Sequence, residues 1–288
     1  MSEDISMQPA AMNQPAETVI AGRCLRVGIE AVEIRGPGLI DWVHSLSVLT
    51  GIAPYCSAPI VLEAPAQLSP AERRRAIPTV KLALAVGLAA VERSGYDPGA
   101  LPAVFASSGA DGNTINAILS ALATPDREVS PTQFHNSVHN APSGYWGVAV
   151  QSREAVTSLS AYDASFAMGL LEASVQAVSG GQPILLIAYD APYPDPLDNV
   201  RPITSSFGAA FVVTPVPSAR KLAELHIRMA VEPAGNESRC INAGLEDLRR
   251  GNPAARCLPL LVMLAAGSTG TVRMDLSHGV LEIAVTPC

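Results

Sequence analysis

Alternation of apolar and polar residues predicts a strand in CLRVGIEAVEIRGPG, which begins at Cys24 and ends in a Gly-Pro-Gly turn. Residues 39–51 have a short helical pattern. At Ser69 the sequence SPAE, which is typical of a helix start, opens a segment whose apolar residues, up to Val91, are too dense for a surface helix. We therefore expect a helix that is buried on most sides.

The next segments alternate between strand-like and helix-like patterns. AVFASS predicts a short buried strand, and TINAILSALA predicts an amphipathic helix after the glycine loop GADGN. A strand at about 155–160 leads into a helix at about 164–178. The small residues of this helix would allow it to be buried between two layers. PILLIAYDA is typical of a strand covered on both faces, and SSFGAAFVVTP predicts another strand. Over residues 25–215 this alternation predicts an α/β fold with a largely parallel sheet covered by helices.

Beyond Pro217 the pattern is weaker. Alternation predicts a strand over residues 223–229, NAGLEDLRRG predicts a helix, and GTVRMDLSHGVLEIAVTP predicts a β-hairpin that turns near His278. The polar opening segment lacks the basic start and apolar core of a signal peptide. We expect residues 1–20 to form a flexible tail and residues 21–288 to form a single domain.

Composition and charge exclude several classes of protein. The 288 residues are 48% hydrophobic, which suits a globular chain with a well-filled core. Only 16% are charged, which favours a surface covered by an oligomer interface. The net charge is −7 and the longest basic run is RRR at 73–75, so nucleic acid is not an expected partner. No apolar run is long enough to span a bilayer, so we expect a soluble protein that does not insert into a membrane.

The cysteines indicate neither disulfides nor a metal site. Their number is odd and none are in C-x-x-C spacing, which argues against a disulfide framework and a zinc site and favours a reducing cytoplasm. They are Cys24, Cys56, Cys240, Cys257 and Cys288.

The segment TSLSAYDASFAMGLLEA, residues 157–173, raises the question of chemistry. A strand, a turn of small residues and an apolar helix are the arrangement in which several enzyme families present a nucleophile. Here the residue expected at the top of the turn is Asp163. An aspartate near a helix start also has a structural explanation, because it can cap the helix and interact with its dipole.

Three segments resemble the β-ketoacyl synthases of the thiolase-like superfamily. SLSAYDASFAMGLLEA resembles their nucleophile elbow, SPTQFHNSVHNAPSGYWGVA resembles the segment before that elbow in the synthase-like N-terminal-domain family, and SSFGAAFVV resembles their Phe-Gly-x-Gly-Ala strand. The resemblance covers residues 25–215. It implies a thiolase-like half fold, to which the C-terminal β-hairpin is an extension.

The sequence departs from this family at the catalytic positions. With Ser158, Ser160 and Ser165 in register with the family motif, the cysteine position falls on Asp163, and a carboxylate cannot form a thioester. The family's His-Gly-Thr-Gly-Thr and Asn-x-x-Gly-His strings do not occur after residue 180, and His226 and His278 are expected to be structural or exposed. The chain has room for little more than the first half of a full synthase.

The resemblance therefore implies a subunit without catalysis of its own, of the chain-length-factor type. Such a subunit pairs with an active ketosynthase in type II fatty acid or polyketide (polyene-type) synthesis and shapes the pocket for the acyl chain. It also binds acyl-carrier protein and needs no cofactor or metal. The bulky Tyr162 and Phe166 would be the floor or plug of that pocket. The residues expected at the pocket or partner interface are Phe134, His135, His139, Asn140, Tyr162, Ser165 and Phe166.

Several alternatives remain open. His135 and His139 have the spacing of metal ligands on a helix, but no glutamate or third carboxylate accompanies them. Ser160 or Ser165 lacks the Gly-x-Ser-x-Gly frame of a hydrolase, and GADGN lacks the Gly-Lys-Ser/Thr ending of a phosphate-binding loop. The chain could also be a decarboxylase or acyltransferase that acts on malonyl- or acyl-carrier protein, or a homodimeric scaffold that binds acyl-carrier protein.

Overall fold

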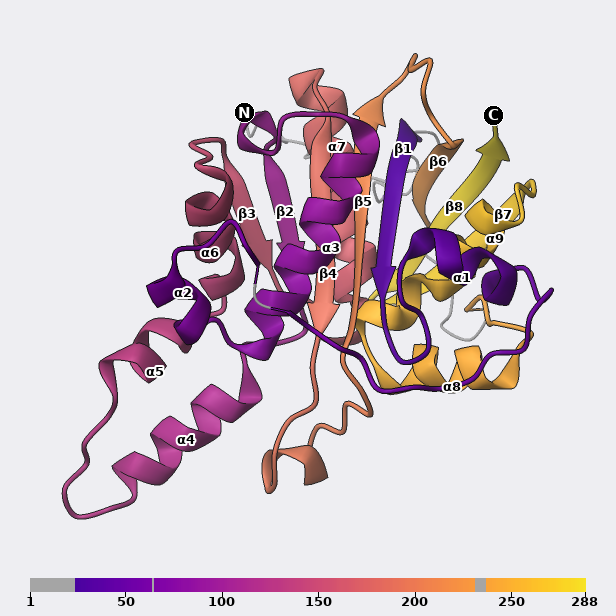
Figure 1. The fold of residues 1–288 in the computed structure, drawn as a ribbon. Coiled ribbons are helices and arrows are strands. Elements are labelled where there is room, and N and C mark those ends of the chain that lie inside the picture. The colour runs from indigo at the N-terminus through magenta and orange to yellow at the C-terminus, as the bar shows by residue number, and fades with distance from the viewer. Residues whose placement is uncertain (1–23, 64, 231–236) are drawn as a thin grey trace, which may run out of the picture.

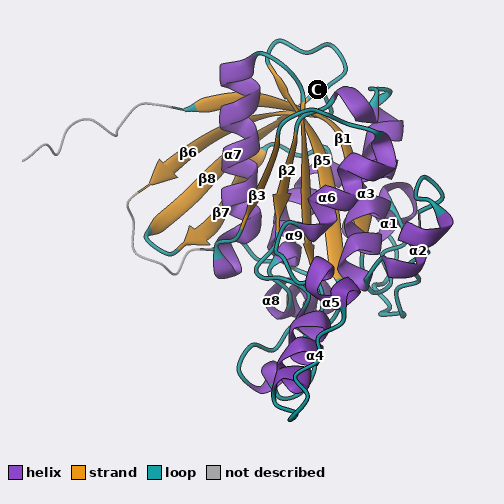
Figure 2. Ribbon diagram, turned by 90° about the vertical axis from the view of Figure 1, so that its left-hand side faces the viewer, coloured by secondary structure: helices purple, strands orange, loops and turns teal. Residues whose placement is uncertain are grey.

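The computed structural model describes residues 24–63, 65–230 and 237–288, and the predicted tail lies outside this part of the chain. The described residues form a sheet with strand order β3-β2-β4-β5-β1-β6-β8-β7 (Figure 1). Helices α3 and α6 lie on one side of the sheet and α7 lies on the other (Figure 2). The strands are β1 (Leu25–Arg35), β2 (Ala103–Ala106), β3 (Val156–Leu159), β4 (Ile184–Asp190), β5 (Phe207–Pro215), β6 (Ala223–Ala230), β7 (Gly270–Leu276) and β8 (Gly279–Pro287). The α-helices are α1 (Trp42–Leu49), α2 (Pro70–Arg75), α3 (Pro78–Ser94), α4 (Gly112–Leu122), α5 (Pro131–Asn136), α6 (Ala141–Val150), α7 (Ser165–Gly180), α8 (Ala243–Gly251) and α9 (Leu258–Ala265).

The α/β class is confirmed, but the sheet is mixed rather than largely parallel. Strand β2 pairs in parallel with β3 and β4, whereas β5 is antiparallel to both β4 and β1. The physical reason is the link between β4 and β5. It has no crossover helix, and without one β5 returns beside β4 in the opposite direction.

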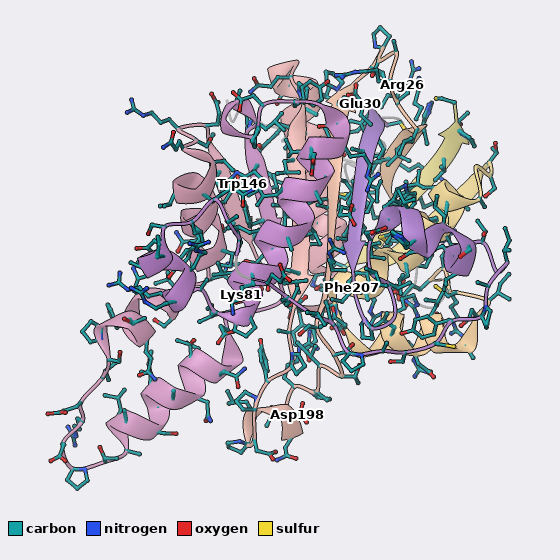
Figure 3. All side chains as sticks on the ribbon, in the orientation of Figure 1. Arg26, Glu30, Lys81, Trp146, Asp198 and Phe207 are labelled. Carbon is teal, nitrogen blue, oxygen red and sulfur yellow. The ribbon has the colours of Figure 1, made fainter. Side chains whose placement is uncertain are left out.

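Two apolar cores lie on the two sides of the sheet. One contains α3 and α6 and includes Trp146 of α6 (Figure 3). Trp146 contacts Phe105 of β2 edge-on, with 6.3 Å between ring centroids. The expected helix after Ser69 is present but divided. Ser69 accepts a hydrogen bond from the Glu72 N–H at 3.3 Å and starts α2, and Pro78 starts α3. Proline in a helix interior would lose a backbone hydrogen bond, so the chain breaks before it.

Helix α7 packs on the sheet through small residues. A Cβ on Gly169 would come within 2.6 Å of the Cβ of Ala106, so only glycine permits this close approach to β2. The opposite side of α7 exposes Val175 and Val178, by 43% and 46%. The expectation that this helix is buried on both sides is therefore wrong for the isolated chain, which places a layer on one side of the helix.

The C-terminal segment extends the same sheet. Strand β6 pairs with β1, β8 pairs with β6, and β7 and β8 form the predicted hairpin, which is confirmed. Asn242 starts α8 by accepting the N–H groups of Gly244 and Leu245 at 3.0 and 3.1 Å. Helix α9 was not predicted from the sequence. None of the helices in the described residues is long and apolar enough to cross a bilayer.

Candidate functional site

The carboxyl ends of three parallel strands meet at one edge of the sheet. Strand β3 leads into the turn 160–165, here called the elbow, β2 leads into Ser107 and Ser108, and β4 ends at Asp190. This is where ligands bind in many α/β sheets. The three ends are joined directly, because Ser160 Oγ donates to the Ser108 carbonyl oxygen at 2.9 Å and Ser108 Oγ donates to Asp190 at 2.8 Å.

Tyr162, not Asp163, is at the top of the elbow. Its φ of 54° is in the left-handed region, which costs a non-glycine residue about 1 to 2 kcal/mol. Ser165, itself buried, secures the turn: its Oγ donates to the Tyr162 carbonyl oxygen at 2.7 Å and accepts the Ala161 N–H at 3.0 Å. Asp163, which is expected at the top from the sequence, follows Tyr162 directly.

Asp163 forms ion pairs and does not cap helix α7. Arg201 donates to its Oδ1 at 2.7 Å, and Arg256 Nη2 lies 3.4 Å from its Oδ2. Residue 164 is the N-cap of α7 and makes no side-chain cap hydrogen bond. The Arg201 guanidinium also lies over the Tyr162 ring, 3.5 Å from its centroid, so one arginine holds both residues of the turn.

Asp190 is the most perturbed carboxyl group at this edge. Burial raises its pKa to about 6, against the opposing effect of the hydrogen bonds from Ser108 and Ser107 and the charge of Arg201. Its Oδ1 accepts Ser107 Oγ at 3.0 Å and the Ser108 N–H at 2.9 Å, whereas its Oδ2 has no hydrogen-bond partner within the described structure. The group is fully enclosed, so its place is structural rather than open to a ligand.

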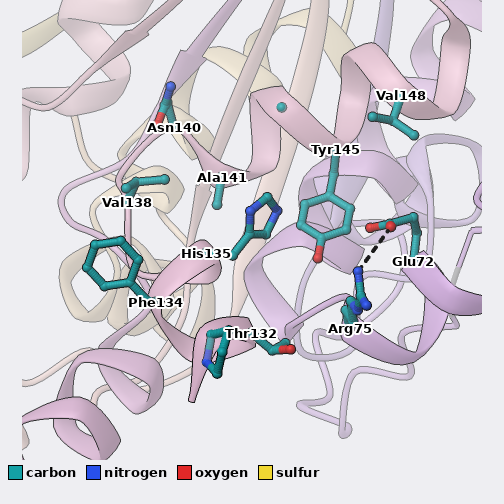
Figure 4. Close-up of a pocket in the computed structure, with 12 residues that line it drawn as sticks. Glu72, Arg75, Thr132, Phe134, His135, Val138, Asn140, Ala141, Tyr145 and Val148 are labelled. Atoms are coloured by element: carbon teal, nitrogen blue, oxygen red, sulfur yellow. Dashed lines mark hydrogen bonds and ion pairs between the residues drawn. The ribbon is translucent and has the colours of Figure 1, made fainter. Parts of the chain in front are cut away.

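A groove of about 740 Å³ lies between α2, α5 and α6 (Figure 4). It brings together the predicted residues Phe134, His135 and Asn140. His135 contacts Tyr145 edge-on, with 5.9 Å between ring centroids. Other residues also line it that the sequence did not single out, and those on α6, at positions 144, 145 and 148, have the spacing of one helix face. These other residues include Thr132, Val138, Gly144, Tyr145 and Val148.

The other predicted site residues lie elsewhere. His139 places Nε2 3.2 Å from the Ser107 carbonyl oxygen, beside β2. Tyr162 lines a separate cavity of about 340 Å³ with Asp163, Arg256 and residues of β7. Phe166 is fully buried and packs on Phe211 with 5.4 Å between ring centroids, so its predicted place at the pocket or interface is wrong. A side chain in the α7 core cannot reach either.

The glycine loop GADGN has a structural explanation, and the described residues form no metal site. Tyr193 lies against Gly109 and Gly112, where a Cβ would meet its atoms at 2.1 and 2.3 Å, so packing explains both glycines. Asp111 caps α4 by accepting the Thr114 N–H at 2.9 Å. Within the described ranges, no group of three or more His, Cys, Asp or Glu side chains is arranged to hold a metal ion.

Comparison with known families identifies the chain. The family described as "Beta-ketoacyl synthase, N-terminal domain" matches residues 53–248, more than half of the sequence. The chain belongs to this family. In this β-ketoacyl synthase-like chain the top of the elbow therefore presents a phenol, and residues 160–165 include no cysteine.

Solved structures of synthase complexes share its fold. A chain of the ketosynthase ApeO in complex with its chain length factor ApeC from Xenorhabdus doucetiae aligns with a TM-score of 0.68 at 21% identity, over 90% of this chain and 99% of that chain. The ishigamide ketosynthase/chain length factor aligns at 0.66 and 12% identity, over 90% and 98%. The AntDE:AntF complex, a type II PKS acyl-carrier protein with its ketosynthase, aligns at 0.68 and 10% identity, over 92% and 100%. A comparison with curated proteins found no match.

Proposed function

We propose that this chain is a non-catalytic subunit of chain-length-factor type that pairs with an active β-ketoacyl synthase in type II fatty acid or polyketide (polyene-type) synthesis. The observation that carries the proposal is the elbow: Tyr162 is at its top under the Arg201 guanidinium, and Asp163 is paired with two arginines. An acyl thioester needs a thiolate there. The proposal assigns the subunit to the cytoplasm.

A partner is favoured by the exposed edge of the sheet. Strand β3 is an edge strand, and Val156 on it is exposed. Val148 of α6 is exposed nearby in sequence, and helix α4, which extends away from the sheet in Figure 1, exposes Leu119 and Leu122. Exposed edge strands and apolar side chains are the features that a partner covers. The partner proposed is the active synthase, and a second copy of this chain is the alternative outcome.

The groove between α2, α5 and α6 suits the pocket-shaping role, and we call it the acyl groove. Apolar side chains, including Phe134, Val138 and Val148, offer contact to an alkyl chain, and polar side chains such as Glu72 and Arg75 lie among them and could orient a polar end. Gly144 lies in α6 on this groove, and a Cβ added there would meet nothing within 4 Å. Residue 144 can therefore be enlarged into the groove without a clash at its Cβ.

Catalytic silence is tested directly with the purified chain. Incubated with malonyl- and acyl-carrier protein, it is expected to release no carbon dioxide and to gain no acyl mass. In a complex with its synthase, Asp163→Asn is expected to leave turnover within about twofold of the unchanged complex, because it loses only partly exposed ion pairs. Carbon dioxide release, acylation, or loss of turnover by orders of magnitude in a folded, paired variant would show that this subunit is an enzyme.

Enlarging Gly144 is expected to shorten the product. The Gly144→Leu side chain fills part of the acyl groove, and because a pocket wall selects which chain fits, product length should change more than the overall rate. The measurement is the product distribution of the reconstituted complex by mass spectrometry. Gly147→Leu is the matched control: Gly147 is in the same helix, does not line the groove, and has only the Ser152 carbonyl oxygen near its added Cβ, at 3.9 Å. Equal product distributions in the two variants would contradict this role of the groove.

The acyl-carrier protein is proposed to approach over α2. Arg74 and Arg75 are exposed there, and Arg75, which lines the acyl groove, forms a long ion pair of 3.5 Å with Glu72. Charge reversal in Arg74→Glu should weaken binding of an acidic carrier protein to the complex by about twofold to tenfold, mainly through slower association. Calorimetry or surface binding at low salt measures this, with Arg250→Glu, an exposed change on α8, as the control. An equal loss in both variants would assign the effect to net charge instead.

A further inference from the structure

A second groove lies on the other side of the sheet and is here called the α9 groove. It has a volume of about 580 Å³ and lies between the end of α1, the start of α8, helix α9 and strand β7. Its walls belong to the core that includes α7, whereas the acyl groove lies beside the core of α3 and α6. The α9 groove is therefore a separate site that the proposed function does not use.

The lining of the α9 groove is largely apolar. The walls combine branched side chains with Met263, whose flexible thioether adapts to irregular ligands. Burial raises the pKa of the Cys240 thiol to about 12, so this group is neutral and adds to the apolar surface. The principal apolar residues are Val48, Leu49, Leu245, Val262, Met263 and Val272.

One charged side chain is present among the residues that line this groove. Arg239 is exposed, and within the described part of the chain it makes no hydrogen bond or ion pair. Arg239 has a longer-range electrostatic interaction with Glu246. The Glu246 carboxylate, however, accepts a hydrogen bond from the Arg249 guanidinium on each oxygen, at 2.8 Å. Arg239 thus remains available to an anion outside the chain.

We propose that the α9 groove binds a single-chain amphiphile, with its alkyl chain among α1, α8 and α9 and its anionic head group beside Arg239. The volume is in the range of small-ligand sites, and an apolar interior with one cation suits an apolar chain that ends in a carboxylate or a sulfate. The alkyl chain displaces water from the apolar walls, and the arginine donates to the head group. The head-group chemistry is common to alkanoates and alkyl sulfates, and the experiment separates them.

Titration calorimetry of the full chain with octanoate, decanoate and dodecanoate, below their micellar concentrations, tests the proposal. Each additional methylene should tighten saturable one-to-one binding by about two- to fourfold until the groove is filled. Decanol should bind about two- to fivefold more weakly than decanoate, because it lacks the charge that Arg239 meets. Decyl sulfate shows whether the site distinguishes a sulfate from a carboxylate, and binding of either supports an anionic head group. No saturable binding, or decanol equal to both anions, would overturn the proposal.

Variants locate the ligand. Arg239→Gln should weaken decanoate by about two- to fivefold and leave decanol unchanged, with Arg250→Gln as the control on the same segment. Ala266→Phe adds a ring at the exposed edge of the groove and should abolish chain binding, whereas Ala243→Phe, exposed and outside the groove, should not. If Gly144→Leu abolishes binding and Ala266→Phe does not, the ligand occupies the acyl groove and the proposal is wrong. That outcome leaves the proposed pocket-shaping function intact, so the two failures are distinguishable.

Discussion

Phe166→Ala is expected to lower the free energy of unfolding by about 3 to 5 kcal/mol, because it removes a fully buried ring and leaves a cavity. Phe166 packs on Phe211 of β5, and the surrounding core of α7, β1 and β5 is held by the sheet and can relax only partly. Urea unfolding of the isolated chain measures the loss. The slope of the unfolding free energy against urea concentration should be the same for the variant and the unchanged chain.

Val175→Ala is the matched control, since Val175 is on the exposed side of the same helix and its removal should change stability by no more than about 0.5 kcal/mol. The comparison also decides the function of Phe166. A stable Phe166→Ala variant that changed product length in the complex would return this residue to the pocket and contradict its place in the core. A variant that loses stability in the isolated chain supports the core position.

The sequence alone predicts Phe166 as core if the period of its helix is used. Phe166, Leu170, Ala173 and Ala177 follow one another at intervals of four, three and four residues, which is one face of an α-helix, and all four are buried. The resemblance to the elbow implies a role for residues near the turn, but nearness in sequence does not give side-chain direction. Tyr162 and Phe166 are four residues apart, yet Tyr162 is exposed and Phe166 is fully buried.

Local patterns predicted most elements because each has a local physical cause. All seven residues of β4 are buried, in agreement with its continuous apolar run, and the alternation of β7 and β8 gave their hairpin. The left-handed conformation of Tyr162 had no such signal, since glycine or asparagine is the usual residue there. The proline-rich link after β4 does indicate the direction of β5, because a neighbouring strand that is reached without a crossover helix is antiparallel.

Features that need distant segments could not be predicted. Strand β6 joins the sheet by pairing Arg26 with His226, two hundred positions apart in sequence, and periodicity gives no information on such pairs. The acyl groove needs α2 to lie beside α5 and α6, and the ion pairs of Asp163 need Arg201 and Arg256 to meet over the elbow. The sequence therefore indicates the elbow and the segment before it as a candidate region, while the contacts between the side chains of that region depend on tertiary structure.

The unfolding free energy is expected to fall by about 3 kcal/mol as the pH rises from about 4 to about 6, and Asp190 is the cause. Burial raises the pKa of Asp190 to about 6 in the folded chain, from 3.8 for an unperturbed carboxyl group. Between these values the folded state holds a proton that the unfolded state has released, so folding is favoured at low pH and loses this contribution as the pH rises. The difference of about two pKa units corresponds to about 3 kcal/mol, and above about pH 6 the contribution is constant.

Urea unfolding at intervals between pH 4 and pH 7 measures this dependence, and Asp190→Asn is the decisive variant. Asparagine keeps an oxygen to accept the hydrogen bonds of Ser107 and Ser108 but cannot ionise, so its stability should be flat across the window in which the unchanged chain declines. Its amide nitrogen replaces the unpartnered Oδ2 and costs about 1 to 3 kcal/mol, but that cost is the same at every pH and leaves the slope unaffected. The hydrogen-bonded Glu224, whose pKa is lowered to about 2 chiefly by Lys221, acts in the opposite direction between about pH 4.5 and pH 2, so it overlaps only the lowest part of this window. If Asp190→Asn retains the full slope, another group binds the proton, and the charge of Asp190 is stabilised by its neighbours far better than its burial implies.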